Sequence, residues 1–525
     1  MSNPGPNSQS TTNTFGLTTS NLSSSAALTA HADAHTAMGL NGRIAGVNAG
    51  KLAVAMGDSI VAGGNYTSTT GTLKGNGNTI SIAYNNHGIY PGGDVFITGC
   101  TEDGFNGYFT NAIVIDANNA QVVSDRSVSG TATVLTDQQG ATAAIQVMVP
   151  ERVNDRSFIE MANATLGHPI DRMINAGGSG QSSTMMLARF DRDVIAWNPD
   201  IVILGSCARN DLNTAAYSQT RTLGNIQSMI NKALAINATV FLFFITPKAN
   251  DLKEMALNTA LSQLARSTPG VIAVNIIGAT LNTTSATGDW IASYSTDGTH
   301  PNSLGARRMT DNAFTPSLKL MFPNIVNRLG FISSADDRSV NATSTQALRN
   351  PGFLTTTGGS VGGTATGTAP ANYSCTNSSG PTTAFSTTAR TIAADGDTLG
   401  NNLVITMSGA ASGVVDVLCD SLDALVSVGE KFIFTCSMRT ASIANLRNVA
   451  AFVEVTAGGI TYTVSAMDYN GSGSCSDDFN WVLQTKAFTI PSGMTSVVVR
   501  WKATFAANPS GVINIGAPAL RLVTS

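Results

Sequence analysis

Three side chains in two short segments of this chain have the types needed for nucleophilic attack on a carbonyl group. Ser59 stands in MGDSI after the apolar run LAVAM, and Asp297 and His300 stand in DGTHP. A serine hydroxyl is a weak nucleophile near neutral pH unless an imidazole takes its proton and a carboxylate fixes the tautomer of that imidazole. We therefore predict that Ser59, His300 and Asp297 are a catalytic nucleophile, base and orienting acid.

The order of short motifs along the chain resembles the SGNH (GDSL) hydrolase family. The four segments that carry the resemblance are Gly57-Asp58-Ser59, INAGGSGQSST with Gly180, Asn210-Asp211 after PDIVILGSCAR, and Asp297-x-x-His300. The resemblance covers roughly residues 49–330 and implies a serine hydrolase. No metal or organic cofactor is expected.

Two features depart from the usual pattern of that family. Ala208 stands where a glycine is usual, and the nearest preceding glycine is Gly205, so the loop that carries Asn210 is expected to take a different path. The long separation of Ser59 from Gly180 implies an insertion between the first and second segments.

An acyl transfer passes through a tetrahedral oxyanion, and the loss of one donor to that oxygen costs roughly 3–4 kcal/mol. We predict that the backbone N–H of Ser59, the backbone N–H of Gly180 and the side-chain amide of Asn210 form the oxyanion hole. Taken alone, each segment has an ordinary interpretation, because Asp-Gly is common in turns and Asn or Asp favours a helix N-cap. Their joint occurrence favours the catalytic interpretation.

Composition limits the classes of partner. The chain has 525 residues, of which 12% are charged, and a formal net charge of −4. This length predicts two to four domains, and the few basic residues argue against nucleic acid as a partner. No apolar run is long enough to predict a membrane span, and the polar start of the chain does not have the pattern of a secretory signal.

The region from residue 49 to 330 has the pattern of an α/β domain. Apolar runs at LAVAM, MINAG, IVILG, VFLFFIT and VIAVNII predict buried strands, and helical spacing of apolar residues lies between them. We predict a doubly wound parallel sheet with its site at the carboxyl ends of the strands. The alternating segments at about residues 64–150 predict an inserted small β module, for which a substrate-binding or gating role and a structural or trimer-contact role are both open.

Residues 1–48 form a polar arm, either disordered or used for attachment, and residues 331–350 read as a linker. Short β runs over residues 351–525 predict an all-β sandwich of jelly-roll type, similar in layout to carbohydrate-binding modules. Its aromatic residues either stack on sugar rings or pack in the core, and its cysteines are either free buried thiols or disulfide partners. The aromatic candidates are Tyr373, Tyr469, Trp481 and Trp501, and the cysteines are Cys375, Cys419, Cys436 and Cys475.

These patterns together predict a serine esterase that removes O-acetyl groups from a polysaccharide. A short-chain esterase or lipase without sugar specificity is the alternative within enzymes. The polar ends and β modules also look like bacteriophage tail fibre or tailspike proteins, which implies a homotrimer, attachment to a virion through the N-terminal arm, and action on a host capsule or O-antigen. A structural or adhesive virion protein that uses the hydrolase domain for binding is the alternative from another class. The expected location is the virion or an extracellular surface, or the cytoplasm if the protein is not viral.

Overall fold

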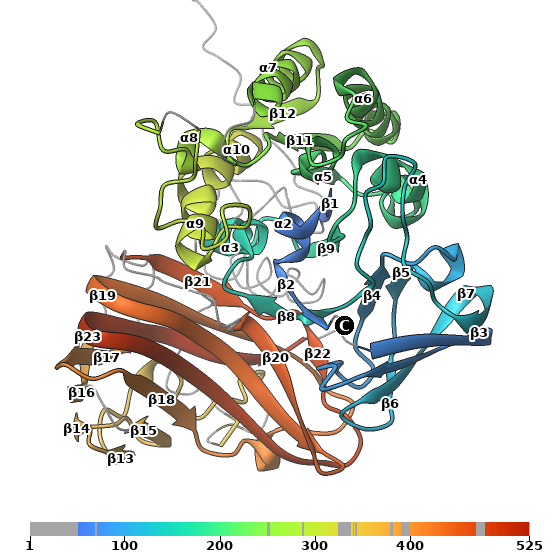
Figure 1. Ribbon diagram of the computed structural model, residues 1–525. Coiled ribbons are helices and arrows are strands. Elements are labelled where there is room, and N and C mark those ends of the chain that lie inside the picture. Colours follow the sequence, from blue (N-terminus) through green and yellow to red (C-terminus); the bar gives the residue numbers. More distant parts are fainter. Residues whose placement is uncertain are drawn as a thin grey trace, which may run out of the picture.

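The computed structural model describes residues 51–68, 71–248, 252–285, 288–323, 338–339, 341, 344–378, 382–389, 400–468 and 478–523 (Figure 1). The predicted N-terminal arm, much of the predicted linker, Tyr469 and Cys475 lie outside the described residues.

Five parallel strands form the sheet of the hydrolase region. Their order is β12-β11-β10-β1-β9, so the strand that leads to Ser59 lies between two others. The strands are β1 (Leu52–Gly57), β9 (Arg172–Gly177), β10 (Ile201–Gly205), β11 (Thr239–Phe243) and β12 (Val271–Val274). The prediction of a parallel sheet is confirmed, and each strand overlaps one of the predicted apolar runs and extends at most one residue beyond it.

Helices cover both faces of this sheet, which is why its strands are apolar at successive positions. Ala53 and Ala55 of β1 pack in one core with helices on one face, whereas Val54 and Met56 pack in another core with helices on the opposite face. The first face is covered by α3 (Phe158–Thr165), α9 (Ser303–Met309), a π-helix (Thr310–Phe314) and α10 (Thr315–Met321). The second is covered by α4 (Ser183–Asp193), α6 (Gln219–Ala235) and α7 (Leu252–Ser267). Shorter helices are α2 (Ser59–Ala62), α5 (Arg209–Leu212) and α8 (Ile277–Thr280).

The segment between α2 and α3 is β-rich. It contains β2 (Asn65–Ser68), β3 (Gly71–Tyr84), β4 (Val95–Thr98), β5 (Gly107–Phe109), β6 (Ile113–Val114), β7 (Asn119–Thr131) and β8 (Gln146–Asn154). The strands β3, β7 and β6 form an antiparallel sheet, and the N–H of Ile115 donates to the carbonyl of Asn119 across the turn between β6 and β7. Buried side chains of this segment form their own core, which includes Ile80, Phe105 and Val122.

The C-terminal region is also β-rich. Two long antiparallel strands, β19 (Lys431–Ala457) and β23 (Met494–Leu522), pair with each other, and register shifts interrupt their ladder. The other strands are β13 (Ser360–Gly363), β14 (Thr366–Gly367), β15 (Tyr373–Ser378), β16 (Thr382–Ala389), β17 (Asn401–Ser408), β18 (Gly413–Cys419), β20 (Ile460–Asp468), β21 (Asn480–Gln484) and β22 (Phe488–Thr489). The jelly-roll sandwich itself stays a prediction.

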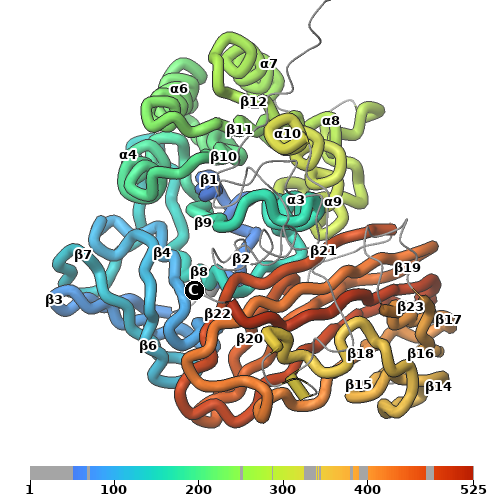
Figure 2. Tube along the Cα trace, turned by 180° about the vertical axis from the view of Figure 1, so that it is seen from behind, coloured from blue at the N-terminus to red at the C-terminus, as the bar shows by residue number. Residues whose placement is uncertain are grey.

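The insertion and the C-terminal region lie beside the hydrolase region (Figure 2), and one buried core contains side chains from all three. Strand β8 pairs in parallel with β20, and Arg152 of β8 forms an ion pair with Asp468 of β20 at 2.5 Å. One apolar core extends from the α3 face of the parallel sheet into β19 and β23. The end of the insertion is therefore tied to the C-terminal region.

Three of the four aromatic candidates for sugar stacking are core residues. Tyr373 and Trp501 are 1% exposed and Trp481 is 6% exposed, so none offers a ring face to a ligand. Cys375, Cys419 and Cys436 are buried free thiols, as are Cys100 and Cys207. Within the described ranges, no helix is both long and apolar enough to cross a membrane.

Candidate active site

Ser59 is the first residue of α2 and follows the carboxyl end of β1. The turn is tight, since a Cβ atom on Gly57 would lie 2.0 Å from the carbonyl oxygen of Gly205 in β10. Asp58 caps the helix, because its side chain accepts a hydrogen bond from the N–H of Ile60 at 2.9 Å. A glycine and a capping acid thus place the serine hydroxyl at the end of an internal strand.

Asp58 is fully buried beneath this turn. Burial raises the pKa of Asp58 to about 7, although the Ile60 N–H and the nearby Arg209 guanidinium favour its ionised form. The Asp58 carboxyl group therefore caps α2 and does not contact solvent.

The structure brings the three predicted catalytic side chains together. Ser59 Oγ lies 2.8 Å from His300 Nε2, and His300 Nδ1 lies 2.7 Å from Asp297 Oδ2. Asp297 Oδ1 accepts hydrogen bonds from the backbone N–H groups of Thr299 at 2.9 Å and His300 at 2.8 Å. Asp297 therefore both forms the turn that its Asp-Gly sequence predicts and contacts the imidazole.

The environment of Asp297 keeps it ionised. Partial burial would raise its pKa, but the backbone and side-chain hydrogen bonds from His300 and the Thr299 N–H hold that pKa well below its usual range. An ionised Oδ2 requires a proton on His300 Nδ1, which leaves Nε2 as the acceptor facing Ser59. This is the tautomer that can remove the serine proton.

The loop that carries His300 is supported from several sides. Ser295 Oγ donates to the carbonyl of His300 at 2.6 Å, and Asn302 caps α9 by accepting from the N–H of Gly305 at 2.9 Å. Ser303 Oγ donates to the Asp155 carboxylate, whose backbone N–H donates to the carbonyl of Asp468 in β20 at 3.0 Å. The C-terminal region therefore supports the loop that holds the imidazole.

Neither the sequence motifs nor the composition pointed to Asp155. It follows β8, and nothing local in its sequence marks it as a partner of Ser303. The two residues are 148 positions apart, so only the packing of α9 against the end of β8 identifies the contact.

The second and third motif segments meet at the predicted oxyanion donors. Asn210 Nδ2 donates to the carbonyl of Gln181 at 3.0 Å, so the Asn210 amide lies next to the residue after Gly180. Gly180 has a φ of +75°, and a Cβ atom there would lie 2.4 Å from the carbonyl oxygen of Thr142. Only glycine fits this loop without a shift.

Asn210 is the second residue of α5 and not its N-cap, which is Ala208. Its neighbour Asp211 is buried and joins α5 to the start of α4. The Asp211 carboxylate accepts from Ser183 N at 2.7 Å and Ser183 Oγ at 2.6 Å, and from Thr222 Oγ1 at 2.9 Å. Asp211, which the motif included without a role, therefore fixes Asn210 relative to the Gly180 loop.

The insertion borders this loop. Gln181 Nε2 donates to Thr98 Oγ1, the N–H of Ala144 donates to the carbonyl of Ser179 at 3.1 Å, and Ser182 Oγ donates to Asp137. These contacts give the insertion a structural role beside the predicted oxyanion hole.

The sequence profile of the GDSL-like Lipase/Acylhydrolase family matches residues 150–308. The chain contains a domain of this family. The matched range includes Gly180, Asn210, Asp297 and His300, and it begins after the insertion that separates them from Ser59. No curated protein matches the chain.

Several solved structures resemble parts of the chain. A protein described as an acylhydrolase from Bacteroides fragilis is 30% identical, with a TM-score of 0.26, over 28% of this chain and 75% of its own. A carbohydrate esterase family 3 protein from Talaromyces cellulolyticus is 22% identical, with a TM-score of 0.25, over 30% of this chain and 75% of its own. The CBM22-1 xylan-binding domain of Paenibacillus barcinonensis Xyn10C is 15% identical, with a TM-score of 0.22, over 33% of this chain and 93% of its own.

Proposed function

We propose that this protein is a serine esterase that removes O-acetyl groups from a polysaccharide. The observation that carries the proposal is the hydrogen-bonded series from Ser59 Oγ to His300 Nε2 at 2.8 Å and from His300 Nδ1 to Asp297 at 2.7 Å. This arrangement matches the nucleophile, base and orienting acid of serine acyl transfer.

The reaction follows from these positions. Ser59 Oγ attacks the acyl carbonyl carbon as its proton passes to His300 Nε2, and the N–H groups of Ser59 and Gly180 with the Asn210 amide stabilise the oxyanion. When the tetrahedral intermediate collapses, the imidazolium protonates the departing sugar oxygen. Water then loses a proton to His300 and attacks the acyl-enzyme, and the imidazolium returns that proton to Ser59 Oγ as the bond from Oγ to the acyl carbon breaks and the acetyl group leaves as the free acid.

The preference for a polymeric substrate is supported by the openness of the site. The Asp297 side chain is 54% exposed and that of His300 is 34% exposed, so a bulky sugar chain can approach the base. The insertion contacts the Gly180 loop and the C-terminal region supports the His300 loop, so each can extend the contact surface beside the site. The virion setting, the host polysaccharide and the homotrimer stay predictions from the sequence.

Acetate release from acetylated xylan and from an acetylated bacterial capsule tests the proposal, with 4-nitrophenyl esters of increasing chain length as a second series. We expect acetate release from at least one polymer and its loss in Ser59→Ala. A preference for long acyl chains would favour the lipase alternative. Binding to cells without hydrolysis of any ester would favour the adhesive alternative, and acetate release that persists in Ser59→Ala would disprove the nucleophile.

A further inference from the structure

A cavity of about 250 Å³ lies where the hydrolase region, the insertion and the C-terminal region meet. Its walls come from α3, the first residues of β9, the start of β19, and the segment that follows β21. Arg172 and Met173 line it at the beginning of β9, whereas the Gly180 loop follows the other end of that strand at Gly177. The strand alone separates these ends by about 16 Å. The cavity is therefore distinct from the Ser59 site.

Four polar side chains that line this cavity have hydrogen-bonding capacity that the protein does not use. Glu160, Gln484, Arg172 and Lys431 line the cavity, and no residue in the described part of the chain hydrogen-bonds to their side chains. Glu160 and Gln484 are partly exposed and Arg172 and Lys431 are exposed, so these four side chains face the open space of the cavity, where they can bind a molecule that enters it.

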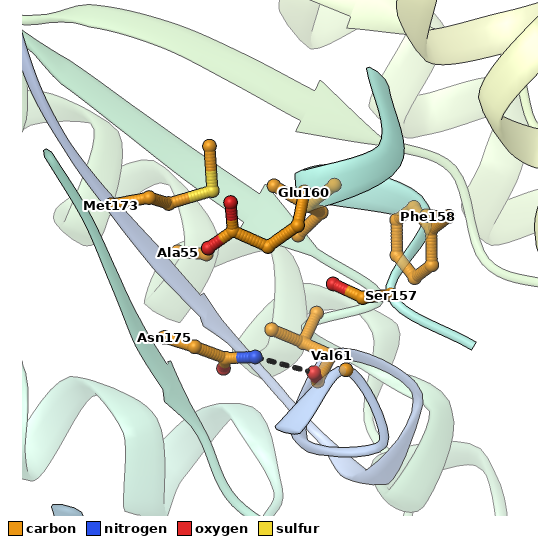
Figure 3. Close-up of a pocket in the computed structure, with 9 residues that line it drawn as sticks. Ala55, Val61, Ser157, Phe158, Glu160, Met173 and Asn175 are labelled. Atoms are coloured by element: carbon orange, nitrogen blue, oxygen red, sulfur yellow. Dashed lines mark hydrogen bonds between the residues drawn. The ribbon is translucent and has the colours of Figure 1, made fainter. Parts of the chain in front are cut away.

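Glu160 lines the cavity described above. It also lines a much smaller cavity, of about 10 Å³, that reaches Val61 of the nucleophile helix α2. Figure 3 shows its carboxyl group turned toward Met173, which lines both cavities. Burial raises the pKa of Glu160 to about 7, although the Lys486 ammonium group favours the ionised form. Near neutral pH this carboxyl group can therefore both donate and accept a hydrogen bond.

The charges around the cavity limit what it can bind. Lys486 is committed to the protein, because Nζ donates to Tyr108 Oη at 3.0 Å and lies 3.9 Å from Asp94 Oδ2. The remaining lining mixes basic residues, Arg172 and Lys431, with acidic ones, Asp171 and Glu160. An anion would meet the acidic groups, a cation would meet the basic ones, and an acyl chain would remove Glu160 and Gln484 from water without offering them a hydrogen bond.

We propose that this cavity is a binding site for a neutral sugar residue. Sugar hydroxyl groups donate and accept hydrogen bonds, so they can satisfy guanidinium, ammonium, amide and carboxyl groups at once. The lining residues include no Phe, Tyr or Trp side chain on which a sugar ring could stack, so hydrogen bonds would supply the recognition. A sugar polymer bound at this site would be held at a distance from Ser59. This binding does not require the esterase activity.

Binding of sugars without ester groups tests this proposal independently of Ser59. The full chain is titrated calorimetrically with xylotriose, cellotriose, mannotriose and galactose, and with glucuronate, glucosamine and octanoate as probes of other classes. Gln484→Leu and Arg172→Met remove hydrogen-bonding groups from two walls of the cavity. Lys232→Met is the matched control, because Lys232 of α6 pairs with Asp191 of α4 and does not line the cavity. Thermal melting identifies any variant that does not fold.

We expect saturable binding of at least one neutral sugar, at least tenfold weaker binding in whichever cavity variants fold, and unchanged binding in Lys232→Met. The proposal is overturned if no neutral sugar binds, or if every folded cavity variant binds as the control does. It is also overturned if glucuronate, glucosamine or octanoate binds more tightly than the neutral sugars.

Discussion

The substitution Asp297→Asn tests the role of the carboxylate while it preserves the shape of the loop. Asp297 Oδ1 accepts from the N–H groups of Thr299 at 2.9 Å and His300 at 2.8 Å, and the amide oxygen of asparagine can take over both bonds. The NH₂ group then faces His300 Nδ1, where Oδ2 now lies at 2.7 Å. Because an NH₂ group only donates, it favours the imidazole with its proton on Nε2, which cannot accept the proton of Ser59.

We expect kcat to fall by about 10³ to 10⁴, the size of effect that a wrong tautomer has in other serine hydrolases. This corresponds to an increase of about 4–5.5 kcal/mol in activation free energy. KM should change by no more than about twofold, because the amide makes no new contact with the acyl group. The assay is the initial rate of 4-nitrophenyl acetate hydrolysis, with thermal melting as the check on folding.

Asp191→Asn is the matched control, since Asp191 is an exposed residue of α4 that pairs with Lys232 at 2.6 Å. It should leave both kinetic constants unchanged. A folded Asp297→Asn variant that keeps more than about a tenth of the wild-type kcat would refute the orienting role.

Three further substitutions probe the Gly180 loop, the hydrogen bonds of Asp211 and the Glu160 carboxyl group in the separate cavity. Gly180→Ala should lower kcat by at least about tenfold with an unchanged circular dichroism spectrum. The reason is that the added Cβ would lie 2.4 Å from the Thr142 carbonyl oxygen and displace a predicted oxyanion donor. An unchanged kcat would show that Gly180 is not part of the oxyanion hole. Asp211→Asn replaces an acceptor of the Ser183 bonds by a donor, so urea titration should give a free energy of unfolding lower by about 1–3 kcal/mol, and equal midpoints would contradict this. Burial raises the pKa of Glu160, so its contribution to the free energy of unfolding is full below its ordinary pKa of 4.5 and is lost as the pH rises through about 7 and the carboxyl group ionises. Glutamine stays neutral, so Glu160→Gln should raise the melting temperature at pH 8 relative to wild type. Thermal melts at pH 5 and pH 8 check the sign, and a gain confined to pH 5 would show that it is wrong.

Local patterns were sufficient to predict the strands of the hydrolase region and one half of the candidate site. Parallel strands buried on both faces are apolar at successive positions, so β1 and β10 were recognisable from their own residues. Asp297 and His300 lie three residues apart in one turn, so the contact between them is local in the sequence. Such features can be predicted from the sequence because the residues that cause them are neighbours in the chain.

The tertiary structure alone decided which distant segments meet. Ser59 and His300 are 241 positions apart, and an insertion separates Ser59 from the range that the family profile matches. The support of Ser303 by Asp155 and the burial of Trp481 depend in the same way on how α9, β8 and β21 pack together. The spacing of apolar residues predicts that one face of an element is buried, but it does not predict which other element covers that face. The covering element is determined by how the shapes of whole helices and strands fit together in the folded protein.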